Sequence, residues 1–174
     1  MKLLVLSDSH GDRQIVSELV DHYYSKVDAI VHCGDSEMEL ADPLMNKLLM
    51  VKGNMDFAEF PLIQKEIIDN QVILVTHGHR FGVNEGLLKL ELLAQQEKAN
   101  LIFFGHTHQL GAEENQGKIF INPGSISQPR GEYAYIGGTY SIVETQNQKV
   151  TVNFYDRKFD RIPELECNFT EGDD

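Results

Sequence analysis

The chain has 174 residues, a formal net charge of −12, 41% hydrophobic residues and 24% charged residues. These values fit one globular domain that buries its own core, and the acidic balance argues against a protein that binds the backbone of a nucleic acid. Cys33 and Cys167 share no CxxC spacing, so we expect reduced thiols rather than a disulfide framework or a cysteine zinc site. No run is long enough for a membrane span and no signal peptide is expected, which favours a soluble, cytoplasmic protein without a membrane partner.

The first third of the chain alternates between strand-like and helix-like segments. Short apolar runs at 2–7, 28–33 and 47–52 are typical of strands that are covered on both faces. Apolar residues recur at helical spacing in 13–25, and a second helix is expected over 36–46. Strands that alternate with helices in this way indicate an α/β fold.

The rest of the chain places further strands before and after one long helix. Asn84 can cap this helix, which carries leucines from 87 to 93 and extends to about Ala99. Its wide apolar face favours core packing and leaves a contact with a second copy, and so a homo-oligomer, as the alternative. The strand candidates around it are 64–68, 72–76, 101–104, 118–121, 133–145 and 148–155, of which the last three look antiparallel.

These elements predict an α/β (α+β) architecture in which two mixed β-sheets pack together and helices cover their outer faces. Residues 1–163 contain no repeat, linker or low-complexity block, so we expect a single domain. The acidic segment 164–174 has little pattern and is expected to form a loosely ordered tail.

Side chains that can bind metals follow the ends of five of the predicted strands. In an α/β sheet, loops at the carboxyl ends of the strands can converge on one point. Carboxylate, amide and imidazole groups together suit Mn²⁺, Fe²⁺, Ni²⁺ or Zn²⁺. The candidate ligands are Asp8, His10, Asp35, Asn54, His77, His106 and His108.

The charge of this ligand set suits an enzyme that acts on an anionic substrate. Asp8 and Asp35 bring two negative charges against the four positive charges of two divalent ions, which leaves positive charge to activate water and attract a phosphate. Taken alone, an Asp-x-His or Gly-Asp pair is more often a turn or a helix cap. The prediction therefore depends on the whole ordered set at successive strand ends.

In its ordered motifs the sequence resembles the calcineurin-like metallophosphoesterase superfamily along nearly its whole length. The motifs are Asp8-Ser9-His10, Gly34-Asp35, Gly53-Asn54, His77-Gly78-His79 and Gly105-His106-Thr107-His108. The stretch from Asn122 to Arg130 is similar to one found in the small prokaryotic phosphodiesterases of the YfcE type. The resemblance implies a four-layer αββα sandwich with two divalent metal ions, and it favours Mn²⁺ for activity.

The resemblance also implies roles for the candidate ligands. Asp8, His10 and His108 would hold the first metal, and Asp35 would bridge to the second. The remaining ligands of the second metal would be Asn54, His77 and His106. A hydroxide that bridges the two ions would attack phosphorus in line, with Asp35 and Asn54 at the catalytic centre.

One block departs from the wider superfamily. Many members have a histidine directly after the asparagine, where it helps to protonate the leaving group, but this chain has Met55. His79 or Asp56 is the candidate to protonate the leaving group instead. General acid catalysis of this kind raises the rate by roughly 10²–10⁴-fold. Arg130 is a candidate to grip the substrate phosphate through its planar guanidinium, with an ordinary surface arginine as the alternative.

The sequence thus predicts a metal-dependent phosphodiesterase that acts on a small phosphate ester. A phosphomonoesterase or a nucleotide pyrophosphohydrolase is the alternative within the enzymes, and the acidic charge argues against a DNA-processing nuclease. A non-catalytic scaffold like the retromer subunit of this fold is the alternative from another class. All seven expected ligand positions carry competent side chains, which argues against that scaffold.

Overall fold

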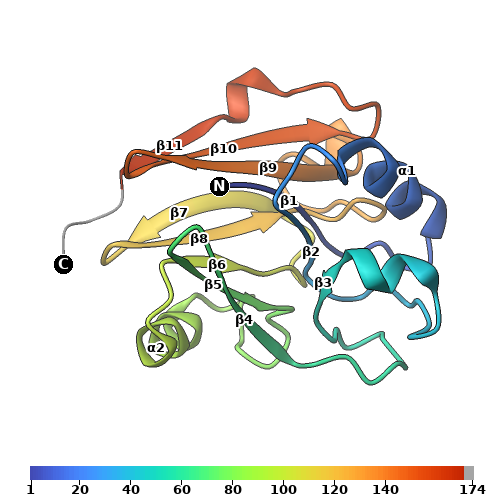
Figure 1. The fold of residues 1–174 in the computed structure, drawn as a ribbon, viewed down its shortest axis with the longest axis horizontal. Coiled ribbons are helices and arrows are strands. Elements are labelled where there is room, and N and C mark those ends of the chain that lie inside the picture. Colours follow the sequence, from blue (N-terminus) through green and yellow to red (C-terminus); the bar gives the residue numbers. More distant parts are fainter. Residues whose placement is uncertain (171–174) are drawn as a thin grey trace.

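The computed structural model, which describes residues 1–170, contains two mixed β-sheets that pack face to face (Figure 1). The first sheet contains β1 (Lys2–Leu6), β2 (Ala29–His32), β3 (Leu49–Met50), β9 (Thr139–Gln146), β10 (Lys149–Asp156) and β11 (Cys167–Thr170). The second sheet contains β4 (Ile63–Ile68), β5 (Gln71–Thr76), β6 (Leu101–Phe103), β7 (Leu110–Asn115) and β8 (Lys118–Pro123). Helix α1 (Arg13–Tyr23) packs on the outer face of the first sheet and α2 (Leu88–Glu97) on that of the second, which confirms the predicted α/β sandwich.

The strand order brings parallel strands together in both sheets. The order is β11-β10-β9-β1-β2-β3 in the first sheet and β4-β5-β6-β8-β7 in the second. Strands β1, β2 and β3 are parallel to one another, and so are β5, β6 and β8. Because parallel strands end at the same edge, the loops that follow these strands are gathered at one end of each sheet.

Strand β1 shows why its sequence is an almost continuous apolar run. Leu3 and Val5 face the second sheet, in a central core that also contains Phe103. Leu4 and Leu6 point the other way and pack against α1. Each fully buried side chain of this kind stabilises the fold by about 1.5–3 kcal/mol, so an apolar residue is favoured at every position of the strand.

The prediction of a helix over residues 36–46 is wrong. The segment is an irregular loop that leads into a 3₁₀ turn at Pro43–Lys47. The backbone N–H groups of Ser36 and Glu37 donate to the carboxylate of Asp56 at 2.9 and 2.7 Å, and the φ angle of Glu37 is 55°. Because a distant side chain takes these N–H groups, the loop satisfies its backbone without helical hydrogen bonds.

Two elements begin later than predicted, and each starts after a glycine with a positive φ angle. Asn84 does not cap α2, whose first residue follows Leu87, and Gly86 with φ 137° separates Asn84 from the helix. Strand β9 starts at Thr139 instead of residue 133, since Gly137 with φ 91° breaks the extended chain.

Strand β7 has no counterpart in the sequence prediction, and β8 is antiparallel to only one of its two neighbours. The β7 sequence LGAEEN lacks the alternation of apolar and polar residues that marks a half-buried strand. Strand β8 is antiparallel to β7 but parallel to β6. The prediction that 118–121 belongs to a purely antiparallel part is therefore wrong on one side of the strand.

The C-terminal segment is more ordered than predicted as far as it is described. Residues Pro163–Leu165 form a 3₁₀ turn, and β11 pairs antiparallel with β10. Cys167 and Phe169 are half-buried and pack against the central core, which supplies the apolar contacts that order the segment. The last four positions of the predicted tail lie outside the described residues.

Within residues 1–170, no helix is long and apolar enough to cross a membrane. Both cysteines have free thiols: Cys33 is buried and Cys167 is half-buried, as expected for a chain without a disulfide.

Candidate metal centre

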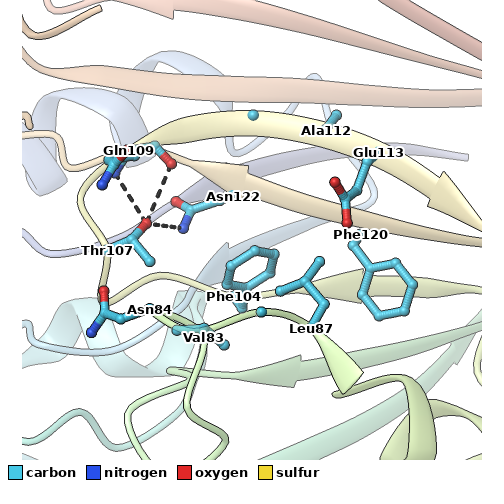
Figure 2. A pocket seen from close by; sticks show the side chains of 12 residues that line it. Val83, Asn84, Leu87, Phe104, Thr107, Gln109, Ala112, Glu113, Phe120 and Asn122 are labelled. Atoms are coloured by element: carbon cyan, nitrogen blue, oxygen red, sulfur yellow. Dashed lines mark hydrogen bonds between the residues drawn. The ribbon is translucent and has the colours of Figure 1, made fainter. Parts of the chain in front are cut away.

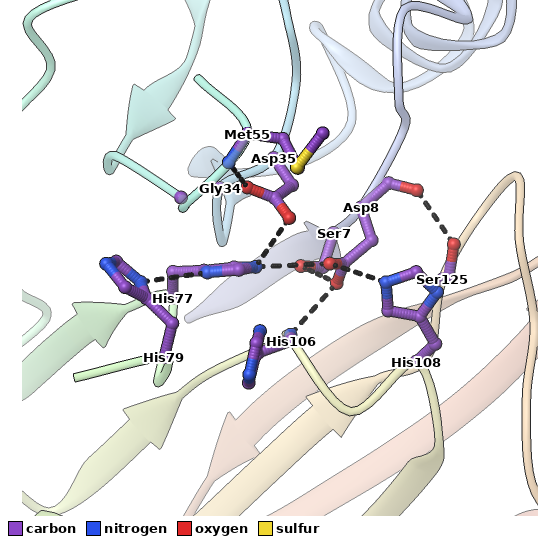
Figure 3. Close-up of polar contacts among 12 residues, drawn as sticks. Ser7, Asp8, Gly34, Asp35, Met55, His77, His79, His106, His108 and Ser125 are labelled. Carbon is purple, nitrogen blue, oxygen red and sulfur yellow. Dashed lines mark hydrogen bonds and ion pairs between the residues drawn. The ribbon is translucent and has the colours of Figure 1, made fainter. Parts of the chain in front are cut away.

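Loops that follow β1, β2, β5 and β6 bring polar side chains together around Asp8 (Figure 3). Asp8 is fully buried, and its Oδ1 atom lies 3.1 Å from Nε2 of His77 and 3.2 Å from Nε2 of His108. Its Oδ2 atom accepts hydrogen bonds from Ser7 Oγ at 2.5 Å and from the backbone N–H of His106 at 3.2 Å. One carboxylate therefore joins the first sheet to two loops of the second.

A first group of candidate ligands consists of Asp8, His10 and His108, whose ligand atoms lie within 4.8 Å of one another. His108 donates from Nδ1 to the carbonyl oxygen of Gln128 at 2.6 Å, so its neutral form presents a lone pair on Nε2. The Nδ1 atom of His10 lies 2.9 Å from the Glu37 carboxylate, which leaves the Nε2 lone pair of His10 free as well. The two Nε2 atoms are 3.2 Å apart and both face Asp8.

A second group consists of Asp8, Asp35 and His77, all of which are buried. The Nε2 atom of His77 lies 3.5 Å from Oδ2 of Asp35, and its Nδ1 lies 3.1 Å from Nδ1 of His79. Asp8 belongs to both groups, whereas the family resemblance implies Asp35 as the shared ligand. His79 is placed to hold the ring of His77 with its Nε2 atom toward the two carboxylates.

Asn54, His106 and Arg130 lie beside these two groups rather than within them. The ring of His106 is 5.1 Å from that of His77, between centroids. Asn54 is exposed, and the N–H of its neighbour Met55 donates to Asp35 Oδ1 at 2.7 Å. Arg130 has an exposed side chain, and its backbone N–H donates to the carbonyl of His108 at 3.0 Å.

Five candidate ligands have a left-handed backbone, which costs a residue other than glycine roughly 1–2 kcal/mol. Their φ angles are 53° for Asp8, 44° for His10, 52° for Asp35, 68° for His106 and 59° for His108. Such strain is maintained only where surrounding contacts hold it, and it gathers at functional sites.

Two glycines allow the close approach of loops in the centre. A Cβ atom on Gly53 would collide with the carboxylate of Asp35, and one on Gly105 would collide with the side chains of Ser7 and Asp8. Glycine is therefore required at positions 53 and 105 by the space beside the two carboxylates.

Asp56 holds two of the loops together. It is 6% exposed, and its Oδ2 atom accepts from the N–H groups of Asp35 at 2.9 Å and Gly53 at 2.8 Å. Its Oδ1 atom accepts from Ser36 and Glu37. A carboxylate with all these donors positions the loops of Asp35 and Asn54 and has no free oxygen to protonate a leaving group, so that suggested role is wrong.

Other polar residues brace the centre from behind. Asn122 donates from Nδ2 to the carbonyl oxygen of Gly105 at 3.1 Å and to Thr107 Oγ1 at 3.0 Å. Ser125 donates from Oγ to the carbonyl oxygen of Asp8 at 2.7 Å. Sequence reasoning gives no sign of Glu37 or of the Gln128 carbonyl, because their roles arise only from loop geometry.

Burial and neighbouring charges set the protonation of the centre. Burial acts to raise the pKa of Asp8, but hydrogen bonds with His108 and His77 hold that pKa well below its usual range. Burial raises the pKa of Asp35. Burial, together with the charges of His77 and His106, lowers the pKa of His79 to about 4, and it also lowers the pKa of His106. Burial acts to lower the pKa of His108, but Asp8 raises it overall.

The donor set fits divalent metal ions. Imidazole nitrogens and carboxylate oxygens converge on one buried point, and these are the donor types that divalent ions of the manganese and zinc kind take in proteins. The second ring nitrogens of His10, His77 and His108 are each engaged by another group, as is typical of histidines that bind metal.

Comparisons with known proteins agree with this geometry. The model of the calcineurin-like phosphoesterase superfamily domain matches residues 1–148. The chain is 38% identical to the probable metallophosphoesterase YsnB of Bacillus subtilis over 171 residues, which cover 98% of this chain and 99% of YsnB. It is 28% identical to the phosphodiesterase YfcE of Escherichia coli over 159 residues, with 75% of this chain and 82% of YfcE covered.

Solved structures support the same fold. A crystal structure of a conserved protein from Streptococcus pneumoniae, described as a predicted phosphoesterase, superposes with a TM-score of 0.93 at 40% identity and covers 97% of both chains. A zinc complex of Vps29 from Entamoeba histolytica superposes with a TM-score of 0.71 at 18% identity, covering 99% of this chain and all of that one. The second likeness concerns the fold alone.

Proposed function

The chain belongs to the calcineurin-like phosphoesterase superfamily, and we propose from this premise that it is a phosphodiesterase that depends on two divalent metal ions, most favourably Mn²⁺. The observation that supports this most strongly is the convergence of two ligand groups on the buried carboxylate of Asp8. The name of the similar Escherichia coli protein, a phosphodiesterase, supports the choice of a diester as the substrate.

In this proposal the two groups hold one ion each. Asp8, His10 and His108 would bind the first ion, and Asp35, His77, Asn54 and His106 would complete the site of the second. Metal ions bound there would lower the pKa of water and polarise the phosphoryl oxygens. The carboxylate of Asp8, whose pKa is held low, and uncharged ligand types such as imidazole nitrogen would bind cations without adding so much negative charge that an anionic ester is repelled.

The other residues of the centre position the substrate and the ligands. Arg130 would contact a non-bridging phosphate oxygen, because its exposed side chain is next to the loop of His108. His79 would hold the orientation of His77 through their Nδ1 contact, and the variant His79→Ala tests whether it also donates a proton. Asp35 is oriented by the N–H of Met55.

The substrate is a small phosphate ester, with a phosphomonoester or a nucleotide pyrophosphate as the alternatives. A non-catalytic scaffold would not require charged and strained ligands buried at one point, since each costs free energy that a mere binding surface can avoid. The free cysteines and the absence of a membrane-spanning helix in residues 1–170 support a place in the cytoplasm.

The test is hydrolysis by metal-stripped protein before and after addition of Mn²⁺. Bis-p-nitrophenyl phosphate serves as the diester and p-nitrophenyl phosphate as the monoester. We expect diesterase activity that returns with Mn²⁺ and is lost in Asp35→Asn, a variant that keeps the size of the side chain. Folded protein that stays inactive on both esters with Mn²⁺, Ni²⁺ and Zn²⁺ would favour the scaffold, and activity on the monoester alone would replace the diesterase assignment.

A further inference from the structure

Strand β4 forms one edge of the second sheet, and this edge is open. It is the terminal strand in the order β4-β5-β6-β8-β7, so among the described residues β5 is its only strand partner. No proline interrupts its sequence IQKEII, and its register with β5 runs without a bulge. A regular strand with a free row of backbone N–H and C=O groups can pair with a strand of another chain.

The turn after β4 determines which backbone groups face the open edge. Asp69 and Asn70 have φ angles of 52° and 63° and form a two-residue hairpin loop. Ile68 and Gln71, which flank this loop, are opposite each other in the register and exchange both backbone hydrogen bonds. Hydrogen-bonded pairs then alternate along the ladder with pairs that exchange none. The backbone groups that point away from β5 are therefore those of Ile63, Lys65 and Ile67.

The side chains of these outward-facing residues suit a contact with a second strand. Ile67 is 69% exposed and Ile63 is 38% exposed, and β-branched side chains of this kind are favoured within sheets. Lysine often protects an open edge by its charge, but the Nζ atom of Lys65 lies 3.3 Å from Oε2 of Glu97 on α2. This ion pair offsets the charge that would otherwise oppose pairing.

We propose that β4 pairs antiparallel with β4 of a second copy of this chain, which joins the two second sheets into one continuous sheet across a two-fold axis. The outward-facing residues must pair with one another, because only they have free backbone groups on this side. The register with the greatest overlap places Ile63 opposite Ile67 of the second copy and Lys65 opposite its own counterpart. The ladder ends near Pro61, which has no N–H to donate.

This register also matches the side chains on both faces of the joined sheet. On the face that carries α2, Ile63 of each copy meets Ile67 of the other, so the same apolar pair forms twice. On the opposite face, Gln64 of each copy meets Glu66 of the other. Gln64 donates from Nε2 to Glu66 of its own strand at 3.2 Å, and an amide has a second N–H for the other copy. The strand is therefore complementary to itself, and a second copy is the partner that it fits.

The apolar surface beside α2 is a weaker candidate for such a contact. Leu88 and Leu92 are exposed on α2, but a helix face offers no open row of backbone groups to fix a register. Figure 2 shows Phe104 and Phe120 beside Leu87 in the hollow next to this helix, and both phenylalanines are buried in the core under α2. Strand β4 combines exposed apolar side chains with open hydrogen-bonding groups, which the surface of α2 does not. Since β4 carries no candidate metal ligand, this inference is independent of the proposed function.

Substitutions at Lys65 test the backbone pairing. Lys65→Pro removes an N–H that points away from β5, so the hairpin keeps its own hydrogen bonds while the contact between copies loses those at its centre. Lys65→Thr is the matched control, because it removes the charge and keeps the N–H. In sedimentation velocity from low micromolar to near-millimolar concentration, we expect dimers of the wild type and Lys65→Thr and monomers of Lys65→Pro. A wild type that stays monomeric throughout, or a Lys65→Pro dimer with an unchanged dissociation constant, would overturn the proposal.

Substitutions of exposed apolar residues test the side-chain match, and they decide the question if Lys65→Pro does not fold. Ile67→Lys places a charge opposite Ile63 twice in each dimer, and we expect the dissociation constant to rise at least about tenfold. Leu92→Lys changes a similarly exposed residue on α2 and should leave the dissociation constant unchanged. A dimer that is weakened by Leu92→Lys and not by Ile67→Lys would assign the contact to α2 and contradict the proposal.

Hydrogen exchange of the backbone amides tests the register itself. At near-millimolar concentration, we expect the amides of Ile63, Lys65 and Ile67 to exchange more slowly in the wild type than in Ile67→Lys. The amides of Gln64 and Glu66 donate to β5 and should be protected in both proteins. A dimer whose three outward-facing amides exchange as fast as in Ile67→Lys would show that the copies meet elsewhere.

Discussion

At the scale of single residues, the centre depends on side chains that bind no metal themselves. Asp56 accepts hydrogen bonds from the backbone of two loops that carry candidate ligands. Glu37 and the Gln128 carbonyl engage the outer ring nitrogens of His10 and His108. These contacts fix which imidazole nitrogen faces the centre, and so they orient the Nε2 atoms of His10 and His108 for binding a cation.

Asp56→Asn should therefore loosen the centre although the residue is no ligand. The new NH₂ group would face N–H donors on one side of the former carboxylate, and each lost hydrogen bond to a charged acceptor is worth about 1.5–3 kcal/mol. We expect the free energy of unfolding to fall by about 3 kcal/mol or more and Mn²⁺ binding to weaken. Urea denaturation and metal titration measure both effects, with the exposed Asp21→Asn as a control expected to be neutral. An unchanged Mn²⁺ affinity in Asp56→Asn would show that the loops do not need this anchor.

His79→Ala separates two roles of that residue. Because His79 contacts His77 Nδ1 and its pKa is lowered to about 4 by burial, we expect it to orient His77 rather than to supply a proton. Loss of the hydrogen-bond partner of a metal ligand typically lowers activity about 10–100-fold. We expect this loss for substrates with good and with poor leaving groups alike. Rates for bis-p-nitrophenyl phosphate and for a dialkyl ester give the comparison. A loss confined to the dialkyl ester would restore His79 as the proton donor.

His32 makes the stability of the fold dependent on pH. It is fully buried; its Nδ1 accepts from the N–H of Gly34 at 3.2 Å, and Ser9 Oγ lies 2.9 Å from its Nε2. Burial lowers the pKa of His32 to about 4 from the ordinary 6.5. Its contribution is present above pH 6.5 and is lost as the pH falls toward 4, because the unfolded chain then takes up a proton that the folded chain refuses.

From the folded and unfolded pKa values of His32, we expect the free energy of unfolding to fall by about 3 kcal/mol as the pH falls from 6.5 to 4. We expect His32→Asn, which keeps an acceptor for the Gly34 N–H, to remove most of this part of the pH dependence. Unfolding free energies of metal-free protein at several pH values test it against the wild type. Parallel pH curves for the two proteins would show that another group causes the loss of stability.

At the scale of elements, β11 is ordered by its packing against the core, although its own sequence shows no clear strand pattern. Phe169 is half-buried against the central core, whereas Thr170 is exposed. Phe169→Ala should lower the free energy of unfolding by about 2 kcal/mol, less than the 3–5 kcal/mol of a fully buried phenylalanine, and Thr170→Ala should leave it nearly unchanged. Equal, small effects in chemical denaturation would mean that the segment is as loose as its composition suggests.

Sequence patterns predicted the elements whose form depends on their own residues. β1, with its continuous apolar run, and β10, where Val150, Val152 and Phe154 alternate, both appear as expected. The predictions failed where distant contacts decide, as in the loop at 36–46 that Asp56 binds, or where the strand is polar, as in β7. Periodicity carries no information about such contacts.

The candidate site shows the same division. The residue types and their order after successive strands predicted a gathering of metal-binding side chains, and the structure brings Asp8, Asp35 and His77 together from three separate loops. Asn54 and His106, which belong to the same predicted set, lie beside these groups. The left-handed backbone of the ligands and the buried carboxylate of Asp56 could not be predicted, because both depend on how the loops cross. Asn122, the first residue of the stretch that resembles the small phosphodiesterases, donates to the carbonyl oxygen of Gly105 and so braces the loop of His106.

At the scale of the whole molecule, the net charge of −12 has a consequence for function. An acidic protein repels a phosphate ester at long range, so local positive charge must come from Arg130 and from bound cations. Both substrate affinity and turnover should therefore depend on the metal. The two sheets support this arrangement, since each contributes loops to the one buried carboxylate of Asp8.

The most direct measurement is anomalous X-ray scattering from crystals grown with Mn²⁺. We predict two peaks about 3.5–4 Å apart, as in two-metal hydrolases. One ion should contact Asp8, His10 and His108, and the other should contact Asp35 and His77. An absence of manganese at this centre under saturating conditions, or a single ion that leaves Asp35 and His77 without metal, would contradict the two-metal account.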